Sequence, residues 1–318
     1  MPTPAVSVVV ATYRRCALLP RLVEALEQQS IGASKVQLVL VDDASPDDTA
    51  RVVADLAARS SLTVTSLRLP RNCGPAAARN AGWAAATAEV VAFTDDDCVP
   101  TPGWLAAGIA ALTDGAVVAG RTMPNPAQLG QLGPFSRTIR AEDGRFVQTC
   151  NAFYRRADLV ELGGFDERMR TGEDTDLALR ATERGRRIVY AADALVHHDV
   201  RPSSLRATLR ETLRWTDLPL VVRRHPQVRD SHLHQRLWWK PSHPSAAAAM
   251  AGVAAAVAGR RVAPLVATLP WLRHRLLVAP LADGAAERVA ALPGAFAVDA
   301  LEVAVMARAS VKHRTVLL

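Results

Sequence analysis

The sequence has few cysteines, and those it has are scattered. Its four cysteines form no Cys-x-x-Cys pair; they are Cys16, Cys73, Cys98 and Cys150. This spacing argues against a structural zinc site and a disulfide framework, and it fits a reducing compartment. Neither a Gly-x-Gly-x-x-Gly nor a Walker motif is present, so a dinucleotide site and a P-loop are disfavoured as well.

Long hydrophobic runs and a secretory signal are also missing. The chain opens with Met1-Pro-Thr-Pro-Ala, without basic and apolar signal-peptide regions, and leads straight into an expected strand. The apolar runs 246–258 and 262–272 fall short of the roughly 18 to 20 residues that a spanning helix needs. A helical hairpin that crossed the membrane twice would put Arg260 and Arg261 on the far side, against the tendency of basic residues to stay on the cytoplasmic side. We therefore expect a cytoplasmic protein whose C-terminal helices, including one over 295–310, lie in or near a membrane plane.

Acidic residues are scarce in the last third of the chain. Residues 201–318 contain 17 Lys and Arg against 7 Asp and Glu, whereas the first 200 residues contain 21 against 24. Aromatic residues, which stack on nucleic-acid bases, make up only 5% of the sequence. We therefore expect an anionic membrane surface rather than nucleic acid as the partner of this basic region. A basic amphipathic helix over 203–224 suits either that role or packing on the rest of the protein, and an alanine-rich helical subdomain remains the alternative.

The first half of the chain alternates apolar strands with amphipathic helices. Strands are predicted over 6–11, 36–41, 62–67 and 90–94, with further strands over 117–121 and 146–154. Helices are predicted between the first four, over 18–29, 49–58 and 76–86. This order implies right-handed crossovers and an open, mostly parallel sheet, whose ligands bind beyond the carboxyl ends of its strands. The polar clusters that follow the strands should therefore share one crevice.

Three consecutive carboxylates follow the fourth strand. Asp95, Asp96 and Asp97 end the run Val-Val-Ala-Phe-Thr. Three adjacent anions cost free energy unless a cation lies among them, and carboxylate oxygens suit Mg²⁺ or Mn²⁺. The alternative is a solvated acidic turn that caps the helix beginning near Pro102.

Four ordered blocks follow one another along the chain. They are Val8-Val-Val-Ala-Thr-Tyr13, Val41-Asp-Asp-Ala-Ser-Pro-Asp-Asp-Thr49, Asn72-Cys-Gly-Pro-Ala-Ala-Ala-Arg-Asn-Ala-Gly82 and Phe93-Thr-Asp-Asp-Asp97. Together they resemble glycosyltransferase family 2. The resemblance covers about residues 5–200. It implies an α/β GT-A fold, Rossmann-like with a mostly parallel sheet flanked by helices, a nucleotide-sugar donor, a divalent metal and transfer with inversion at the anomeric carbon.

The resemblance also implies roles for residues on the donor side. Thr12 and Asp43 would line the base and ribose pocket with Asp42 beside them, and Arg71 and Arg79 would lie near the nucleotide. Asp97 would ligate the metal directly, and Asp95 would contact the ribose or metal-bound water. Three consecutive aspartates allow two overlapping motifs, Asp-x-Asp or Asp-Asp, so the choice of the acids that touch the ion stays open. We expect Asp96 to matter least. His198, rather than His197, matches the histidine that completes the metal shell.

The acceptor side follows a Gly-Gly-Phe-Asp turn at 163–166. Thr171-Gly-Glu-Asp-Thr-Asp-Leu177 opens a predicted helix to about Arg184, and acids are expected in a first helical turn for the macrodipole alone. The segment resembles the acceptor motif of the family, which implies that Asp174 is the general base and that Glu173 orients the acceptor or a loop.

Together these predictions describe an enzyme with two domains. Residues 1–200 would form the catalytic domain and 201–318 a basic, apolar helical extension that holds the enzyme on the cytoplasmic face of a membrane, near a lipid-linked or glycan acceptor. The alternatives are a non-catalytic scaffold that binds a nucleotide or glycan and, less favoured, a nucleotidyltransferase that also uses paired acids and a metal.

Overall fold

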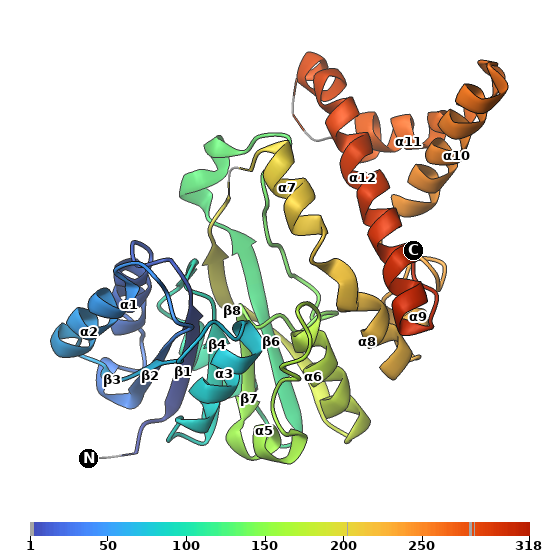
Figure 1. Cartoon of the computed structure of the whole chain (residues 1–318). Helices are drawn as coiled ribbons and strands as arrows, with labels where there is room; N and C mark the ends of the chain where they lie inside the picture. The colour runs from blue at the N-terminus through green and yellow to red at the C-terminus, as the bar shows by residue number, and fades with distance from the viewer. Residues whose placement is uncertain (1–2, 202, 280–281, 283) are drawn as a thin grey trace. The chain divides into compact units, whose positions relative to one another are not determined.

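The computed structural model describes residues 3–201, 203–279, 282 and 284–318, and its chain divides into two compact units (Figure 1). Unit 1 comprises Met1–Leu129 with Thr138–Val200, and unit 2 comprises Gly130–Arg137 with Arg201–Leu318. The first two residues of the segment in which we looked for a signal peptide, Met1 and Pro2, lie outside the described residues.

Unit 1 is built on one sheet of eight strands in the order β3-β2-β1-β4-β7-β6-β8-β5. The strands are β1 (Val6–Thr12), β2 (Val36–Asp42), β3 (Thr63–Arg68), β4 (Val90–Thr94), β5 (Cys98–Pro100), β6 (Ala116–Pro124), β7 (Asn151–Arg155) and β8 (Arg187–His198). Helices cover the sheet: α1 (Leu19–Glu27), α2 (Thr49–Arg59), α3 (Pro75–Ala84), α4 (Trp104–Ala111), α5 (Arg156–Leu162) and α6 (Glu173–Glu183).

Alternating side chains of the central strands fill two cores, one on each face of the sheet. On β1, Val8 and Val10 pack in the core that also contains α1 and α4 side chains, while Val9 packs in the core with α3 and α6 side chains. The run Val8-Val9-Val10 fits this arrangement, because both faces of the strand are buried. The predicted α/β fold with a helix-flanked sheet is confirmed.

The sheet is parallel in its first half and mixed in its second. β3, β2, β1 and β4 pair in parallel, as predicted. β7 then lies antiparallel to both β4 and β6, and β5 lies antiparallel to β8. The strand expected over 146–154 begins later, as β7 at Asn151, and β8 was not among the strands predicted above. An apolar run has the same pattern in either direction, so the sequence alone could not orient β7.

Unit 2 is helical. Its helices are α7 (Leu205–Thr212), α8 (Leu218–Arg224), α9 (Val228–Ser231), α10 (His243–Gly259), α11 (Leu269–Arg273) and α12 (Ala285–His313), with short 3₁₀ turns η3 (Trp215–Asp217) and η4 (Ala263–Thr268) and a π-helical turn η5 (His274–Val278). The single helix expected over 203–224 is divided into α7, η3 and α8, with Pro219 in the first turn of α8, where proline is tolerated.

The last helix is longer than predicted. α12 spans 29 residues instead of the expected 295–310, with Pro293 inside it. By length and composition it is the one helix among the described residues that could cross a membrane, and 44% of its most apolar window is buried inside the protein. The core helix of a soluble unit passes the same test, so this finding is weak evidence for membrane association.

Candidate active site

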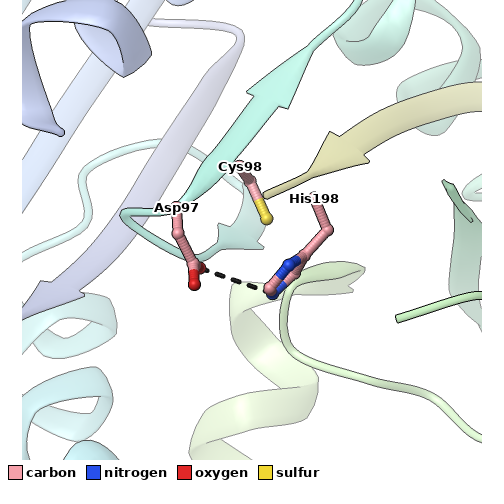
Figure 2. A group of neighbouring side chains, drawn as sticks. All are labelled: Asp97, Cys98 and His198. Carbon is pink, nitrogen blue, oxygen red and sulfur yellow. Dashed lines mark ion pairs between the residues drawn. The ribbon is translucent and has the colours of Figure 1, made fainter. Parts of the chain in front are cut away.

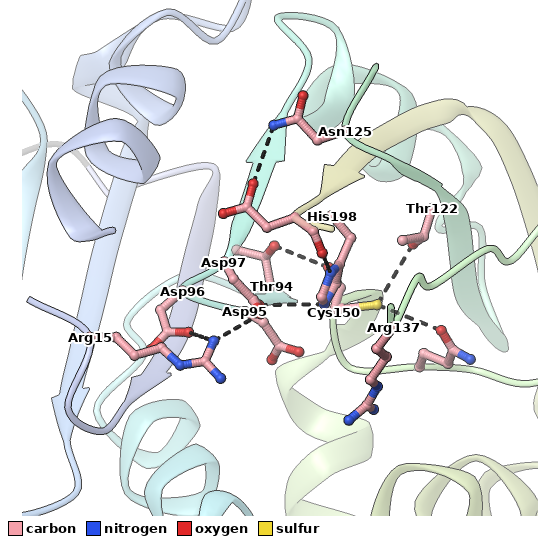
Figure 3. Close-up of polar contacts among 12 residues, drawn as sticks. Arg15, Thr94, Asp95, Asp96, Asp97, Thr122, Asn125, Arg137, Cys150 and His198 are labelled. Atoms are coloured by element: carbon pink, nitrogen blue, oxygen red, sulfur yellow. Dashed lines mark hydrogen bonds and ion pairs between the residues drawn. The ribbon is translucent and has the colours of Figure 1, made fainter. Parts of the chain in front are cut away.

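The three aspartates after β4 have different sets of partners, although Asp96 and Asp97 share Arg15 (Figure 3). Asp95 accepts a hydrogen bond from Arg79 Nη2 at 2.9 Å, and Asp96 accepts one from Thr12 Oγ1 at 2.7 Å. Asp97 is buried, with its Oδ1 3.4 Å from Nε2 of His198. The tight turn between β4 and β5 therefore distributes three adjacent charges among three neighbouring elements.

Arg15 is a site residue that the sequence reasoning missed. Its Nη1 lies 2.9 Å from Asp96 Oδ1 and 2.8 Å from Asp97 Oδ2, so one guanidinium bridges two carboxylates. Burial raises the pKa of Asp96 to about 6, against the opposing effects of Arg15 and the hydrogen bond from Thr12. The sequence feature that could have indicated Arg15 is the basic pair Arg14-Arg15, which follows β1 at the same sheet edge as the aspartates. Asp96, which we expected to matter least, is thus held by two polar partners.

The antiparallel pairing of β5 with β8 brings a histidine to the aspartates. Cys98 pairs with His198 in register, and Asp97, Cys98 and His198 present potential ligand atoms within 4.8 Å of one another (Figure 2). Nδ1 of His198 lies 2.9 Å from the Asp199 carbonyl oxygen. A hydrogen bond from Nδ1–H to this carbonyl leaves Nε2 with a lone pair toward Asp97, as in many histidine metal ligands. His197, the next residue on the strand, pairs with Val99, and burial lowers its pKa.

These residues fit a divalent cation such as Mn²⁺ or Mg²⁺. Asp97 offers a hard carboxylate oxygen and His198 an imidazole nitrogen, a pair suited to Mn²⁺. Burial raises the pKa of the Cys98 thiol well above its ordinary value, which disfavours the thiolate form that binds metals. Asp95, expected to help with the metal, pairs with Arg79 in this structure.

Arg79 joins the donor-side aspartates to the acceptor-side helix. Its Nη2 contacts Asp95, and its Nη1 lies 2.9 Å from Oε1 of Glu173, the first residue of α6. The guanidinium is buried, yet these two carboxylates raise its pKa above the ordinary value. One cation thereby fixes the relative positions of the Asp95 loop and the start of α6.

Asp174 lies beside this ion pair. Its Oδ1 accepts a hydrogen bond from the Thr175 backbone N–H at 2.7 Å, and it accepts another from the Thr149 backbone N–H. Burial and then the Glu173 charge raise the pKa of Asp174 to about 6, although Arg79 and the backbone hydrogen bonds oppose them. The side chain remains partly exposed, so Asp174 is a carboxylate of raised basicity that a substrate can reach.

Two predicted nucleotide-binding aspartates hold loops in place. The Asp42 carboxylate pairs with Arg68 and accepts the Ser45 backbone N–H at 2.9 Å. Asp43 accepts the backbone N–H groups of Cys73 and Gly74 at 2.7 and 2.8 Å. Asp43 therefore shapes the turn that opens α3, where Gly74 has φ of 93°.

The structure brings most of the predicted site residues to one sheet edge. Contacts join Thr12, Asp95, Asp97, His198, Arg79 and Glu173 to the aspartate loop or to one another, and Asp174 follows Glu173 directly. Asp42 and Asp43 are buried at the end of β2 and just beyond it. Arg71 is exposed in the loop that precedes α3.

Asn80, which is not among the site residues predicted above, holds the acceptor side of the site through four hydrogen bonds. Its Nδ2 donates to the Phe165 carbonyl oxygen and to Glu167 Oε1, and its Oδ1 accepts from the Phe165 N–H and from Trp83 Nε1, all at 2.9 Å. The side chain thereby fastens the Gly-Gly-Phe-Asp turn to α3. That turn leads to α6 and its two acids, so Asn80 positions the acceptor side of the site.

We expect Asn80→Ala to lower the free energy of unfolding by about 1–3 kcal/mol, because it leaves partly buried hydrogen-bonding groups without partners. Equilibrium denaturation with urea would measure the loss. Asn72→Ala is the matched control, since Asn72 is exposed and makes one hydrogen bond of 3.3 Å to the Asp43 carbonyl oxygen. Equal losses in both variants would show that Asn80 has no special structural role.

A mixed α/β sheet, with paired acids and an Asp–His pair at the carboxyl ends of its strands, defines a GT-A-type fold. Residues 7–162 match the family model "Glycosyl transferase family 2", and residues 137–279 match "Glycosyl transferase family group 2". The chain therefore belongs to glycosyltransferase family 2, as its sequence blocks had indicated.

Two curated relatives match 62–63% of the chain. A pre-mycofactocin glycosyltransferase of Mycobacterium tuberculosis is 32% identical over 211 residues, which cover 62% of this chain and 43% of that protein. AglE, a glycosyltransferase of Haloferax volcanii, is 26% identical over 63% of this chain and 68% of its own length. The chain thus spans less than half of the first of these proteins.

Two solved structures share the fold. The mannosyltransferase PcManGT from Pyrobaculum calidifontis, in complex with GDP-Man and Mn²⁺, superimposes with a TM-score of 0.60 and 21% identity, over 99% of this chain and 88% of that one. TarS 1–349 from S. aureus, in complex with UDP, gives a TM-score of 0.53 and 19% identity, over 97% and 87% of the two chains.

Proposed function

We propose that this protein is a metal-dependent inverting glycosyltransferase that moves a sugar from a nucleotide-sugar to an acceptor hydroxyl. The observation that carries the proposal is the bridge made by Arg79, which ties Asp95 of the aspartate loop to Glu173 beside Asp174. It couples a cation-binding corner to a basic carboxylate at one sheet edge. The relation to a structure that holds GDP-Man and Mn²⁺ supports the same donor chemistry.

On the donor side, Asp97 and His198 would hold the divalent cation, with Asp95 in support. When bound, such an ion neutralises the negative charge that develops on a departing diphosphate. Thr12, Asp42, Asp43 and Arg71 would surround the nucleotide, with Asp43 acting through the Cys73-Gly74 turn that it holds. These roles extend to this chain what the family blocks imply.

On the acceptor side, Asp174 would take the proton from the attacking hydroxyl. Inversion is a single displacement, so one base suffices: the acceptor oxygen forms its bond to the anomeric carbon as the bond to the diphosphate breaks. The raised pKa of Asp174 makes it a stronger base than an ordinary aspartate. Glu173, fixed by Arg79, would orient the acceptor.

The pH dependence of the reaction should report this base. Because the pKa of Asp174 is raised to about 6, the carboxylate becomes protonated and inactive as pH falls through that value. We expect kcat/KM to fall about tenfold per pH unit below it. Steady-state rates measured from pH 4.5 to 8, at saturating Mn²⁺, would show this decrease in kcat/KM. Full activity at the lowest pH would contradict the assignment of Asp174 as the base.

The second unit would hold the proposed reaction at a membrane. Residues 1–200 would act as the transferase domain and 201–318 as the extension that holds it on the cytoplasmic face. The basic charge of 201–318 supports this location. The acceptor would then be a lipid-linked or polymeric glycan, and nucleic acid has no part in the proposal.

Release of nucleoside diphosphate tests the proposed activity. Purified protein is incubated with UDP-, GDP- and dTDP-sugars, with Mn²⁺, with Mg²⁺ and with EDTA, and the released nucleotide is quantified. We expect one nucleotide class to give metal-dependent release of the diphosphate. Release of pyrophosphate would instead identify a nucleotidyltransferase, and metal-dependent binding with no turnover on any acceptor would identify a scaffold.

A further inference from the structure

Unit 2 leaves a cluster of large apolar side chains in solvent. Seven of the fifteen large apolar residues that the described chain exposes fall within 22 residues, from the end of α10 to η5. They are Val257, Val262, Leu265, Val266, Leu269, Leu277 and Val278, each 40–81% exposed. We call these seven residues the apolar tip. Exposed apolar residues gathered in this way mark an interaction site more often than residues exposed singly.

The core of unit 2 does not use the apolar tip. Near the start of α10, Ala246 and Ala249 pack with Trp271 and with Ala295 and Val303 of α12. Toward its end, α10 leaves the side of α12, and Val257 there is 74% exposed (Figure 1). The packing of unit 2 is thus complete around the first half of α10, whereas the second half and the turns that follow it carry apolar side chains with no role in that core.

The charge around the apolar tip indicates the kind of partner that this surface contacts. Residues 231–282, which include the apolar tip, contain six Lys and Arg and no Asp or Glu. Arg260, Arg261 and Arg273 are exposed among the residues of the apolar tip, and no acid of the described chain pairs with them. Apolar side chains interleaved with unpaired cations match an anionic bilayer, where the apolar groups enter the acyl boundary and the cations remain at the headgroups.

The long helix α12 is a poor alternative as the membrane element. Asp299 is fully buried, accepts a hydrogen bond from Trp271 Nε1 at 2.7 Å and pairs with Arg275. Glu302, one turn further, lies 2.7 Å from Lys240 Nζ and 3.1 Å from His243 Nε2. A spanning α12 would have to take both carboxylates from these partners into hydrocarbon, which is costly. α12 is therefore the core helix of unit 2.

We propose that the apolar tip and the arginines around it form a docking surface for an anionic lipid bilayer, and that the protein lies on the membrane through this surface without spanning it. The proposal makes the membrane location proposed above specific. It does not depend on glycosyl transfer, because it rests on residues of unit 2 alone.

Vesicle flotation with the full chain tests the proposal. Wild-type protein is mixed with vesicles of phosphatidylcholine alone or of phosphatidylcholine with phosphatidylglycerol, at low and high salt. We expect binding to the anionic vesicles that weakens with salt, and a loss of about tenfold or more in the Leu265→Asp/Val266→Asp variant, which puts two charges where apolar groups enter the bilayer. Arg260→Gln/Arg261→Gln should weaken binding to the anionic vesicles and reduce its salt dependence.

Val316→Asp is the matched control, because Val316 is 55% exposed and lies outside the apolar tip; it should bind like wild type. Thermal stabilisation by nucleotide and Mn²⁺, measured on every variant, reports donor binding separately and should not change. Failure of wild type to float, or equal binding by Leu265→Asp/Val266→Asp, would overturn the proposal. Concentration-dependent self-association without flotation would also overturn it, since the apolar tip would then join copies of the chain.

Discussion

Asp174→Asn should abolish sugar transfer while donor binding persists. An amide keeps the shape of the side chain but cannot accept a proton, and a positioned base contributes about 10²–10⁴-fold to the rate. The contacts of Arg79 with Asp95 and Glu173 do not involve the Asp174 side chain, so the donor side should keep its geometry. Transfer is measured as kcat with the donor that the nucleotide-release assay identifies. Donor affinity is measured by calorimetry in the presence of Mn²⁺.

Asp193→Asn is the control for the loss of one negative charge. Asp193 is an exposed residue of β8 in the same unit, and its substitution should leave both kcat and donor affinity unchanged. A variant at 174 that loses donor binding together with transfer would place Asp174 on the donor side. In that case the base would have to be sought elsewhere, with Glu173 as the first candidate.

Asp97→Asn should remove metal-dependent donor binding. The carboxylate is buried beside His198 Nε2 and is the anionic member of this Asp–His pair. Groups that merely support a metal ligand contribute up to about 100-fold in affinity, so loss of a direct ligand should cost at least about that much. Titration with Mn²⁺, followed by electron paramagnetic resonance, measures the affinity without reference to turnover.

Cys98→Ala separates the two possible sets of ligands. Because burial disfavours the Cys98 thiolate and Mn²⁺ prefers oxygen and nitrogen ligands, removal of this thiol should leave Mn²⁺ affinity unchanged, although the cavity lowers stability. His198→Ala, by contrast, should weaken Mn²⁺ binding, as Asp97→Asn should. Strong loss of metal binding in Cys98→Ala would mean that the sulfur is a ligand, and would favour a softer ion such as Zn²⁺.

The donor half of the site was predictable because it follows the strands along the chain. Parallel strands place their carboxyl ends at one edge, so the clusters after β1, β2 and β4 had to converge. The same argument could not show where the side chains point. Asp43 was expected to face a nucleotide, and it instead accepts two backbone N–H groups of the Cys73-Gly74 turn. Its predicted contact with a ligand stays a prediction.

The two arginines show where prediction from sequence stops. Arg79 was placed near the nucleotide on the strength of a family block, but its bridge to Glu173 joins residues 94 positions apart. Arg15 was not selected at all, because an arginine after a strand is usually a solvated surface residue. Its contacts with Asp96 and Asp97 depend on β1 and β4 being neighbours in the sheet.

By itself, the sequence determined the alternation of strands and helices in the first half of the chain, the order of the motif blocks, and the basic, apolar character of the last third. These are local properties, set by periodicity and composition over a few turns or strands. Only the tertiary structure decided the antiparallel insertion of β7, the meeting of Asp97 with His198, and the burial of Asp299 and Glu302 within unit 2. Each depends on pairing between distant segments, which no local pattern encodes.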